Sequence, residues 1–120
     1  MSTPYYTTSV ALTAGIYYGF KLTARNTVGS SLSSDPVFII AATYPNAPIN
    51  VQNVPAQTTG YQISLTWSEG AYNGGSPVID YQVSFTEQSS SSYSIFSSAL
   101  SETEEIITGL TPGVTYKFII

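Results

Sequence analysis

The sequence predicts an all-β protein, built as a two-sheet sandwich and organised as a tandem repeat. A turn with a strand-forming tail, Leu110–Ile120, has a near copy at Leu12–Phe20. In both copies a Leu lies three residues before a Gly, and a Tyr three residues after the Gly opens an alternating strand. The copies are 98 residues apart, the difference between positions 110 and 12, which is about the length of one sandwich domain. Between them lie short apolar and β-branched segments separated by turns.

Three strands are expected in the first part of the chain. Residues 1–4 form a ragged start, and Tyr5–Val10 is aromatic and β-branched enough for a strand. From Tyr18 to Ala24 apolar and polar residues alternate, which predicts a half-buried strand. The apolar run Val37–Ala42 is the third strand, since it is far shorter than the roughly 20 residues that cross a bilayer.

The second part of the chain predicts six strands. They are Ile49–Val54, Ile63–Trp67, Ile79–Phe85, a short edge strand Tyr93–Phe96, Ile106–Leu110, and a last strand from Tyr116. We expect Trp67 in the core between Leu65 and the strand that carries Tyr81 and Val83. On that strand Asp80, Gln82 and Ser84 should point outward. Asn73–Pro77 is expected as a turn and Gln88–Ser92 as a loop.

These motifs resemble the fibronectin type III family. The pattern Tyr18-x-Phe20-x-Leu22-x-Ala24-x-Asn26-x-x-Gly29-x-Ser31-x-x-Ser34 is similar to its F strand, FG loop and G strand. Trp67, the Asn73–Pro77 turn and Tyr81-x-Val83 are similar to its B–C region, and the Leu–Gly–Tyr unit resembles the tyrosine corner of immunoglobulin-like sandwiches. The resemblance covers essentially the whole chain, with two small departures: Ala14 stands where the second copy has Pro112, and Ser9 where it has Ile107.

The resemblance implies one seven-stranded Greek-key sandwich per repeat, with repeats joined head to tail. It also implies that the hydroxyls of Tyr18 and Tyr116 bond to backbone near their own corners. We expect residues 1–43 to be strands E, F and G of a first repeat, 44–48 a Pro-containing linker, and 49–120 strands A to the start of F of a second. Neither piece is a closed sandwich, so we expect strands from neighbouring sequence or a neighbouring copy, and no self-sufficient monomer of this chain.

Catalytic, cofactor-binding and metal residues are expected to be none. The chain has no His and no Cys, which removes the usual base, thiol nucleophile and transition-metal ligands. Adjacent Glu104 and Glu105 should point to opposite faces of a strand. Glu102 and Glu104 share a face, but a Ca²⁺ site needs six or more oxygens and no Asp-x-Asp-Gly loop is present. Asn73-Gly74-Gly75 lacks the Lys and the helix of a phosphate loop, so a hairpin turn is favoured.

Charge excludes one class of partner, and composition suggests two surface features. Only three residues are basic against seven acidic, so nucleic acid is not an expected partner, and no membrane insertion is expected in this segment. Ten tyrosines among many serines resemble an antibody paratope. The simpler interpretation, which we favour, is that Tyr18, Tyr81 and Tyr116 are core residues and the others half-buried strand residues. No Asn-x-Ser/Thr sequon exists; Ser89–Ser92 with Ser97 and Ser98 is either a site of O-linked sugar or a flexible loop.

The leading functional hypothesis is a non-catalytic structural and interaction module of an extended cell-surface or extracellular protein or filament. Its partners would be neighbouring repeats or copies of itself, with a protein or glycan as further candidates. The alternative is an accessory spacer of a secreted carbohydrate-active enzyme, and a third possibility is a receptor-type adhesion module. A Cys-free, Ser/Thr-rich chain with few charges favours the cell exterior.

Overall fold

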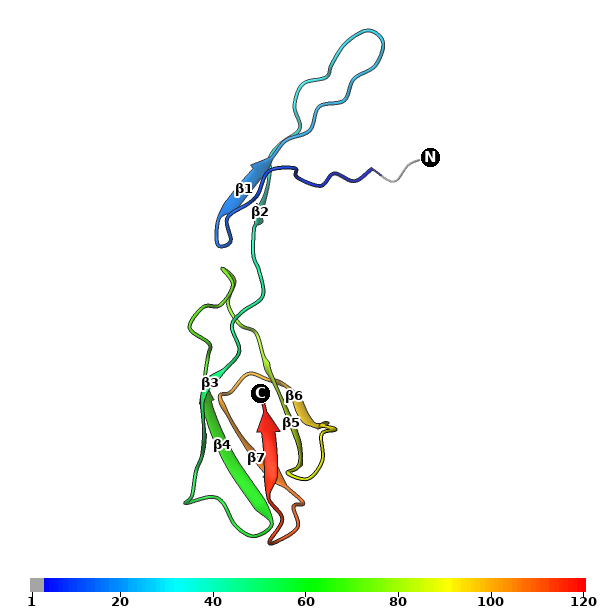
Figure 1. Ribbon diagram of the computed structural model, residues 1–120. Coiled ribbons are helices and arrows are strands. Elements are labelled where there is room, and N and C mark those ends of the chain that lie inside the picture. The colour runs from blue at the N-terminus through cyan, green and yellow to red at the C-terminus, as the bar shows by residue number, and fades with distance from the viewer. Residues whose placement is uncertain (1–3) are drawn as a thin grey trace. The chain divides into compact units, whose positions relative to one another are not determined.

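The computed structural model describes residues 4–120, and every helix or strand assigned in this part of the chain is a β-strand (Figure 1). The strands are β1 (Tyr17–Phe20), β2 (Val37–Ile40), β3 (Ile49–Asn53), β4 (Gln62–Ser68), β5 (Tyr81–Glu87), β6 (Ser94–Leu100), β7 (Glu104–Thr108) and β8 (Tyr116–Ile119). The all-β prediction is therefore confirmed. The expected ragged start falls mostly outside the described residues.

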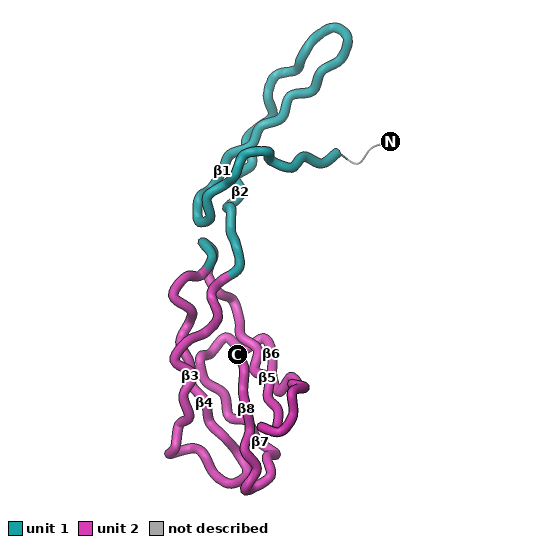
Figure 2. The backbone as a smooth tube through the Cα atoms, viewed as in Figure 1, with its two compact units in different colours: residues 1–44, 74–76 teal, residues 45–73, 77–120 magenta. Residues whose placement is uncertain are grey.

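The chain divides into two compact units, each considered by itself (Figure 2). Unit 1 is the chain up to Tyr44 together with Gly74–Ser76, and unit 2 is Pro45–Asn73 with Pro77–Ile120. Unit 1 holds the antiparallel pair β1 and β2, and unit 2 holds two three-stranded sheets of order β3-β4-β7 and β6-β5-β8. The strands of unit 2 lie where strands A, B, C, C′, E and F were expected, in that order along the chain.

The β1–β2 hairpin has regular strand pairing only at the end where β1 begins and β2 ends. Tyr17 pairs with Ile40 and Phe20 with Val37, and Tyr18 and Phe20 are half-buried as the alternation predicted. Beyond Phe20 serine hydroxyls replace carbonyls as acceptors: Leu22 N donates to Ser34 Oγ (3.1 Å) and Ala24 N to Ser31 Oγ (2.9 Å). The strand predicted for Tyr18–Ala24 therefore ends early, because these side chains interrupt the ladder.

Two other expectations for unit 1 are wrong. Tyr5–Val10 is not a strand, and both Tyr5 (84% exposed) and Val10 (73%) are open to solvent. Its residues have strand propensity, but no strand among the described residues pairs with them, and propensity alone does not hold an isolated strand. Leu22, expected on the half-buried face, is 71% exposed, because it lies beyond the regular part of the hairpin.

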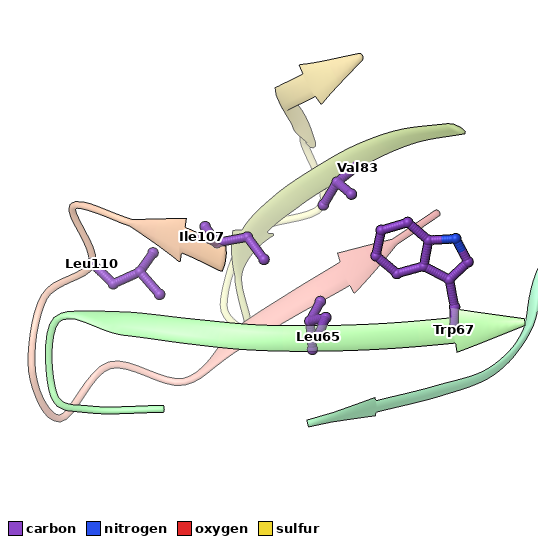
Figure 3. Packing of buried hydrophobic residues seen from close by; sticks show 5 residues of the cluster. All are labelled: Leu65, Trp67, Val83, Ile107 and Leu110. Carbon is purple, nitrogen blue, oxygen red and sulfur yellow. The ribbon is translucent and has the colours of Figure 1, made fainter. Parts of the chain in front are cut away.

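The core of unit 2 lies between its two sheets (Figure 3). Leu65 and Trp67 come from β4, Val83 from β5, Ile107 from β7 and Leu110 from the corner that follows β7. Trp67 is 4% exposed, and its ring meets Tyr81 edge to face with centroids 5.7 Å apart, which confirms its predicted place. Phe85 adds contacts with Phe96, Tyr116 and Phe118.

Four details of unit 2 differ from the sequence-based expectations. Ile79 was expected in the strand and on its core face, but it precedes β5 and is 85% exposed, because pairing with β6 begins only at Tyr81. Ser84 was expected to point outward to solvent, yet it is buried. β5 is the central strand of its sheet, so residues of β6 and β8 flank the small Ser84 side chain on either side. The edge strand β6 is longer than predicted, and β7 begins within the acidic segment, at Glu104.

Candidate interaction surface

The two corners share one geometry, although they belong to different units. Thr13 N donates to the Tyr18 hydroxyl (2.9 Å), and Thr111 N donates to the Tyr116 hydroxyl (3.0 Å), each across five residues. Gly15 (φ 85°) and Gly113 (φ 80°) both adopt the left-handed conformation that permits the turn. The predicted role of the tyrosine hydroxyls is thus confirmed in both copies.

The corners differ in what surrounds them. Leu110 is 7% exposed within the core of unit 2, whereas its counterpart Leu12 is 40% exposed. The same local motif therefore forms with and without a packed core beneath it, because its hydrogen bond and its glycine turn are local.

Strand β8 lies at the edge of its sheet, paired with β5 on one side. Gln88 N donates to Thr115 O (2.8 Å), so the backbone groups of Thr115 face β5. Because alternate residues direct their backbone groups to opposite edges, those of Tyr116 and Phe118 face the other edge. No strand among the described residues pairs with that edge.

Lys117 holds the middle of β8 to the loop between β5 and β6. Its Nζ donates to Ser90 O (2.7 Å) and lies 5.9 Å from the centre of the Tyr93 ring. The loop has accessible serines, since Ser89, Ser91 and Ser92 are exposed. Ser97, by contrast, is half-buried on β6 with a hydroxyl shielded from solvent.

The acidic segment lines a shallow hollow. Glu102, Glu104 and Glu105 border this hollow together with Gln57 and Ser64. Two of these polar groups already have partners: Ile106 N donates to Glu105 Oε1 (3.0 Å), and Ser64 Oγ donates to Gln57 Oε1 (2.9 Å). Across residues 4–120 no group of three or more acidic, His or Cys side chains is placed to hold a metal ion.

Asn73-Gly74-Gly75 is a backbone turn and not a phosphate cradle. Gly74 has φ 79°, and a Cβ added to it would lie 2.1 Å from the Thr43 carbonyl oxygen. Its own carbonyl accepts a hydrogen bond from Thr43 N (2.9 Å). The glycine is therefore required by close packing of backbone on backbone.

The tyrosines divide into two sets. Tyr18, Tyr81 and Tyr116 were expected in the core under the simpler interpretation; all three are half-buried, and Tyr81 and Tyr116 pack against the core of unit 2. The other seven were expected to be half-buried strand residues under that interpretation, but all are exposed: Tyr5, Tyr6, Tyr17, Tyr44, Tyr61, Tyr72 and Tyr93. Amphipathic rings are thus available for contacts on both units.

Sequence reasoning missed the Lys117–Ser90 contact and a polar clasp before β4. In the clasp the Thr58 hydroxyl donates to Asn53 Oδ1 and accepts from Ser64 N (3.1 Å), which supplies partners around the buried Ser64. Lys117 and Ser90 are 27 residues apart, so no local signal could have joined them. Thr58 lies in the Thr- and Gln-rich turn between β3 and β4, whereas Asn53 ends β3 and Ser64 lies in β4; the composition of that turn was the only signal of the clasp.

The sequence limits which catalytic groups the described surface can assemble. Without His or Cys, a Ser-His-Asp triad cannot be assembled within this chain. Residues 4–120 contain no helix that is long and apolar enough to cross a membrane.

Comparison with known proteins agrees with this architecture. Residues 47–120 match the family model described as the fibronectin type III domain. The chain is 32% identical over 113 residues to a Kelch domain-containing protein of Saccharolobus solfataricus, covering 94% of this chain and 15% of that protein. It is 31% identical over 114 residues to human Myomesin-2, covering 91% of this chain and 8% of that protein. The chain thus spans a small fraction of these relatives.

A solved structure gives the same architecture. Domains A168–A170 of titin superpose with a TM-score of 0.62 at 24% identity, over 80% of this chain and 31% of that one. At this level of identity the likeness supports the fold: two sheets in the immunoglobulin-like arrangement.

Proposed function

The chain belongs to the fibronectin type III domain family, and from this premise we propose that it is a non-catalytic spacer and assembly module of a longer tandem array. The module is similar to those of myomesin and titin. We further propose that the array belongs to an extended cell-surface or extracellular protein or filament. Residues up to 43 would be the C-terminal part of one repeat, with β1 and β2 as its strands F and G, 44–48 the linker, and 49–120 the A–F part of the next.

The repeated corner is the observation that carries this proposal. Tyr18 and Tyr116 make the same hydrogen bond to backbone five residues upstream, and Gly15 and Gly113 make the same left-handed turn. Both pairs are 98 residues apart. A period of one domain length in sequence and in local geometry is the signature of repeats joined head to tail.

The character of the surface supports an assembly role. Exposed tyrosines supply contacts, and few charges oppose close approach. Exposed Ser89, Ser91 and Ser92 are sites where an extracellular module would accept O-linked sugar. Protein or glycan partners would meet these loops and edges.

A concatemer tests the array. Residues 23–120 make up one 98-residue period, and Thr23 follows Leu22, the counterpart of Ile120. We would therefore append one, two and three copies of residues 23–120 to the chain and measure small-angle X-ray scattering and cooperative unfolding. The expected result is a maximum dimension that rises by a constant increment per period, with each added period folded.

Two outcomes would contradict the proposal. One is a particle whose dimension grows only as the cube root of its mass, which would mean that the periods collapse on one another. The other is a concatemer whose added periods do not unfold cooperatively. A matched control replaces Gly113 and its equivalents by Val; because these positions need positive φ, the control should lose the regular increment.

A further inference from the structure

We propose that Asn73–Gly74 is a deamidation site that the fold holds closed, and that it opens when the turn leaves the backbone packed against it. Deamidation replaces the side-chain amide of an asparagine by a carboxylate and consumes only water. Asn73 is the only asparagine of the chain that is followed by a glycine. The site is a property of this turn, so it does not depend on the proposed array.

The reaction begins with the backbone nitrogen of Gly74, which attacks the side-chain carbon Cγ of Asn73. The new N–Cγ bond closes a succinimide ring, the Cγ–Nδ2 bond breaks, and ammonia leaves with the proton that the backbone nitrogen gives up. Water then opens the ring: addition at Cγ gives aspartate, and addition at the main-chain carbonyl carbon gives isoaspartate. A following glycine favours the attack because it has no Cβ to obstruct the approach.

The native turn opposes this attack at Gly74 itself. Gly74 is buried, so water and base have little access to its N–H. Its carbonyl accepts a hydrogen bond from Thr43 N (2.9 Å), and a Cβ on Gly74 would overlap the carbonyl oxygen of Thr43. Ring closure requires the Asn73–Gly74 peptide plane to rotate toward the Asn73 side chain. That rotation would drive Gly74 against the Thr43 backbone.

The backbone on both sides of the reacting bond is held as well. On the side before it, Asn46 N donates to Tyr72 O (2.8 Å). On the side after it, Gly75 has φ 85°, and a Cβ on Gly75 would lie 2.7 Å from Gly15 Cα. The bond is therefore anchored from both directions, and its rate of deamidation should follow the fraction of molecules in which the turn has opened.

Deamidation would keep the turn open once it has occurred. In isoaspartate the chain runs through the side chain, which adds a carbon to the backbone before Gly74. Gly74 and Gly75 pack so closely on other backbone that neither has room for a Cβ, so the lengthened backbone no longer fits. The modification thus converts a transient opening into a lasting loss of the Thr43–Gly74 hydrogen bond.

Deamidation rates of the full 120-residue chain test the proposal. The unsubstituted chain, Thr43→Pro and Thr43→Ala are incubated at neutral pH, and peptide mapping with an isoaspartyl methyltransferase quantifies the products at position 73. Each rate is divided by that of a synthetic peptide of residues 70–79, which has the same local sequence and no fold. Thr43→Pro lacks the N–H that Gly74 O accepts, whereas Thr43→Ala keeps it and is the matched control.

We expect the unsubstituted chain and Thr43→Ala to react at least about tenfold more slowly than the peptide. Thr43→Pro should react about two- to tenfold faster than Thr43→Ala, which is the effect of one lost hydrogen bond on the open fraction. Asn53, which is followed by a valine, should stay unmodified in every sample. Should Thr43→Pro unfold unit 2, as read from Trp67 fluorescence, Asn46→Pro with Asn46→Ala is the second pair.

Two results would overturn the gating by the fold. One is an equal rate in the chain and the peptide, which would mean that the fold gives no protection. The other is an equal rate in the Pro and Ala variants of a folded chain, which would mean that these backbone hydrogen bonds do not hold the site closed.

Amide hydrogen exchange tests the lasting opening. The Thr43 N–H should exchange faster in the isoaspartate-containing chain than in Asn73→Asp, which gains the charge but not the extra backbone carbon. An equally slow Thr43 N–H in both chains would overturn the conclusion that the modification keeps the turn open.

Discussion

Replacing Tyr116 by Phe measures the corner hydrogen bond against an internal control. The change removes the hydroxyl that accepts from Thr111 N (3.0 Å) but keeps the ring, whose centroid lies 6.1 Å from that of Phe85. A hydrogen bond contributes about 0.5–1.5 kcal/mol, and water can reach the freed N–H because Thr111 is exposed. We therefore expect a loss of about 0.5–1 kcal/mol from the free energy of unfolding of unit 2.

The assay uses the only tryptophan of the chain. Trp67 lies in the core of unit 2, so its fluorescence in a urea titration reports on the unfolding of that unit. With a slope of about 1 kcal/mol per molar urea, the midpoint should fall by about 0.5–1 M. The measurement is made at low protein concentration, so that association does not add to stability.

Tyr18→Phe is the matched control. It removes the same hydrogen bond from the other corner, to Thr13 N, and that corner belongs to unit 1. The Trp67 transition should therefore stay in place. An unchanged midpoint in Tyr116→Phe, or an equal shift in both variants, would refute the argument that each corner stabilises its own unit.

Three further predictions use neighbouring or equivalent positions as controls. Ile107→Ala should lower the free energy of unfolding, measured by urea titration, by about 2–5 kcal/mol, because Ile107 is fully buried. Ile106 is 40% exposed, so Ile106→Ala should lower it by less than about 1 kcal/mol. Equal losses of stability in the two variants would contradict the assigned core. Gly74→Ala should lower the melting temperature measured by circular dichroism, because the added Cβ would meet the Thr43 carbonyl. Gly29→Ala places its Cβ in open space and should leave the melting temperature unchanged. A lower melting temperature for Gly29→Ala than for Gly74→Ala would refute the packed turn. Calcium should leave the Trp67 transition unmoved, because Glu102 and Glu104 lack enough oxygen partners; a saturable rise in the midpoint would reveal a site.

Local features of this fold could be predicted from the sequence. The tyrosine corners span five residues each, and their hydrogen bonds were implied by the resemblance of the Leu–Gly–Tyr unit to the tyrosine corner of immunoglobulin-like sandwiches. Trp67 was placed correctly because it stands in register with Leu65 on an alternating strand. The Asn73 turn was recognised because adjacent glycines permit positive φ.

Features that depend on distant partners could not be predicted. Tyr5–Val10 has the composition of a strand, but strands exist by pairing, and no described strand lies beside it. Lys117 finds Ser90 across 27 residues, and the hydroxyls of Ser31 and Ser34 replace an expected ladder in a segment whose alternation looked regular.

The irregular attachment of β3 has a mechanical consequence. Load along an array would reach unit 2 through the segment before Ile49, and β3 is held to β4 at only three paired positions, with a register shift between Ile49 and Gln52. All five of its residues are exposed, so little apolar packing resists its removal. Under tension β3 should therefore detach before the continuous β4–β7 pairing is loaded. Freeing the thirteen or so residues up to Tyr61 would add roughly 40 Å of length while Trp67 stays buried. Strand β3 would then lengthen the module under force while the rest of unit 2 stays folded.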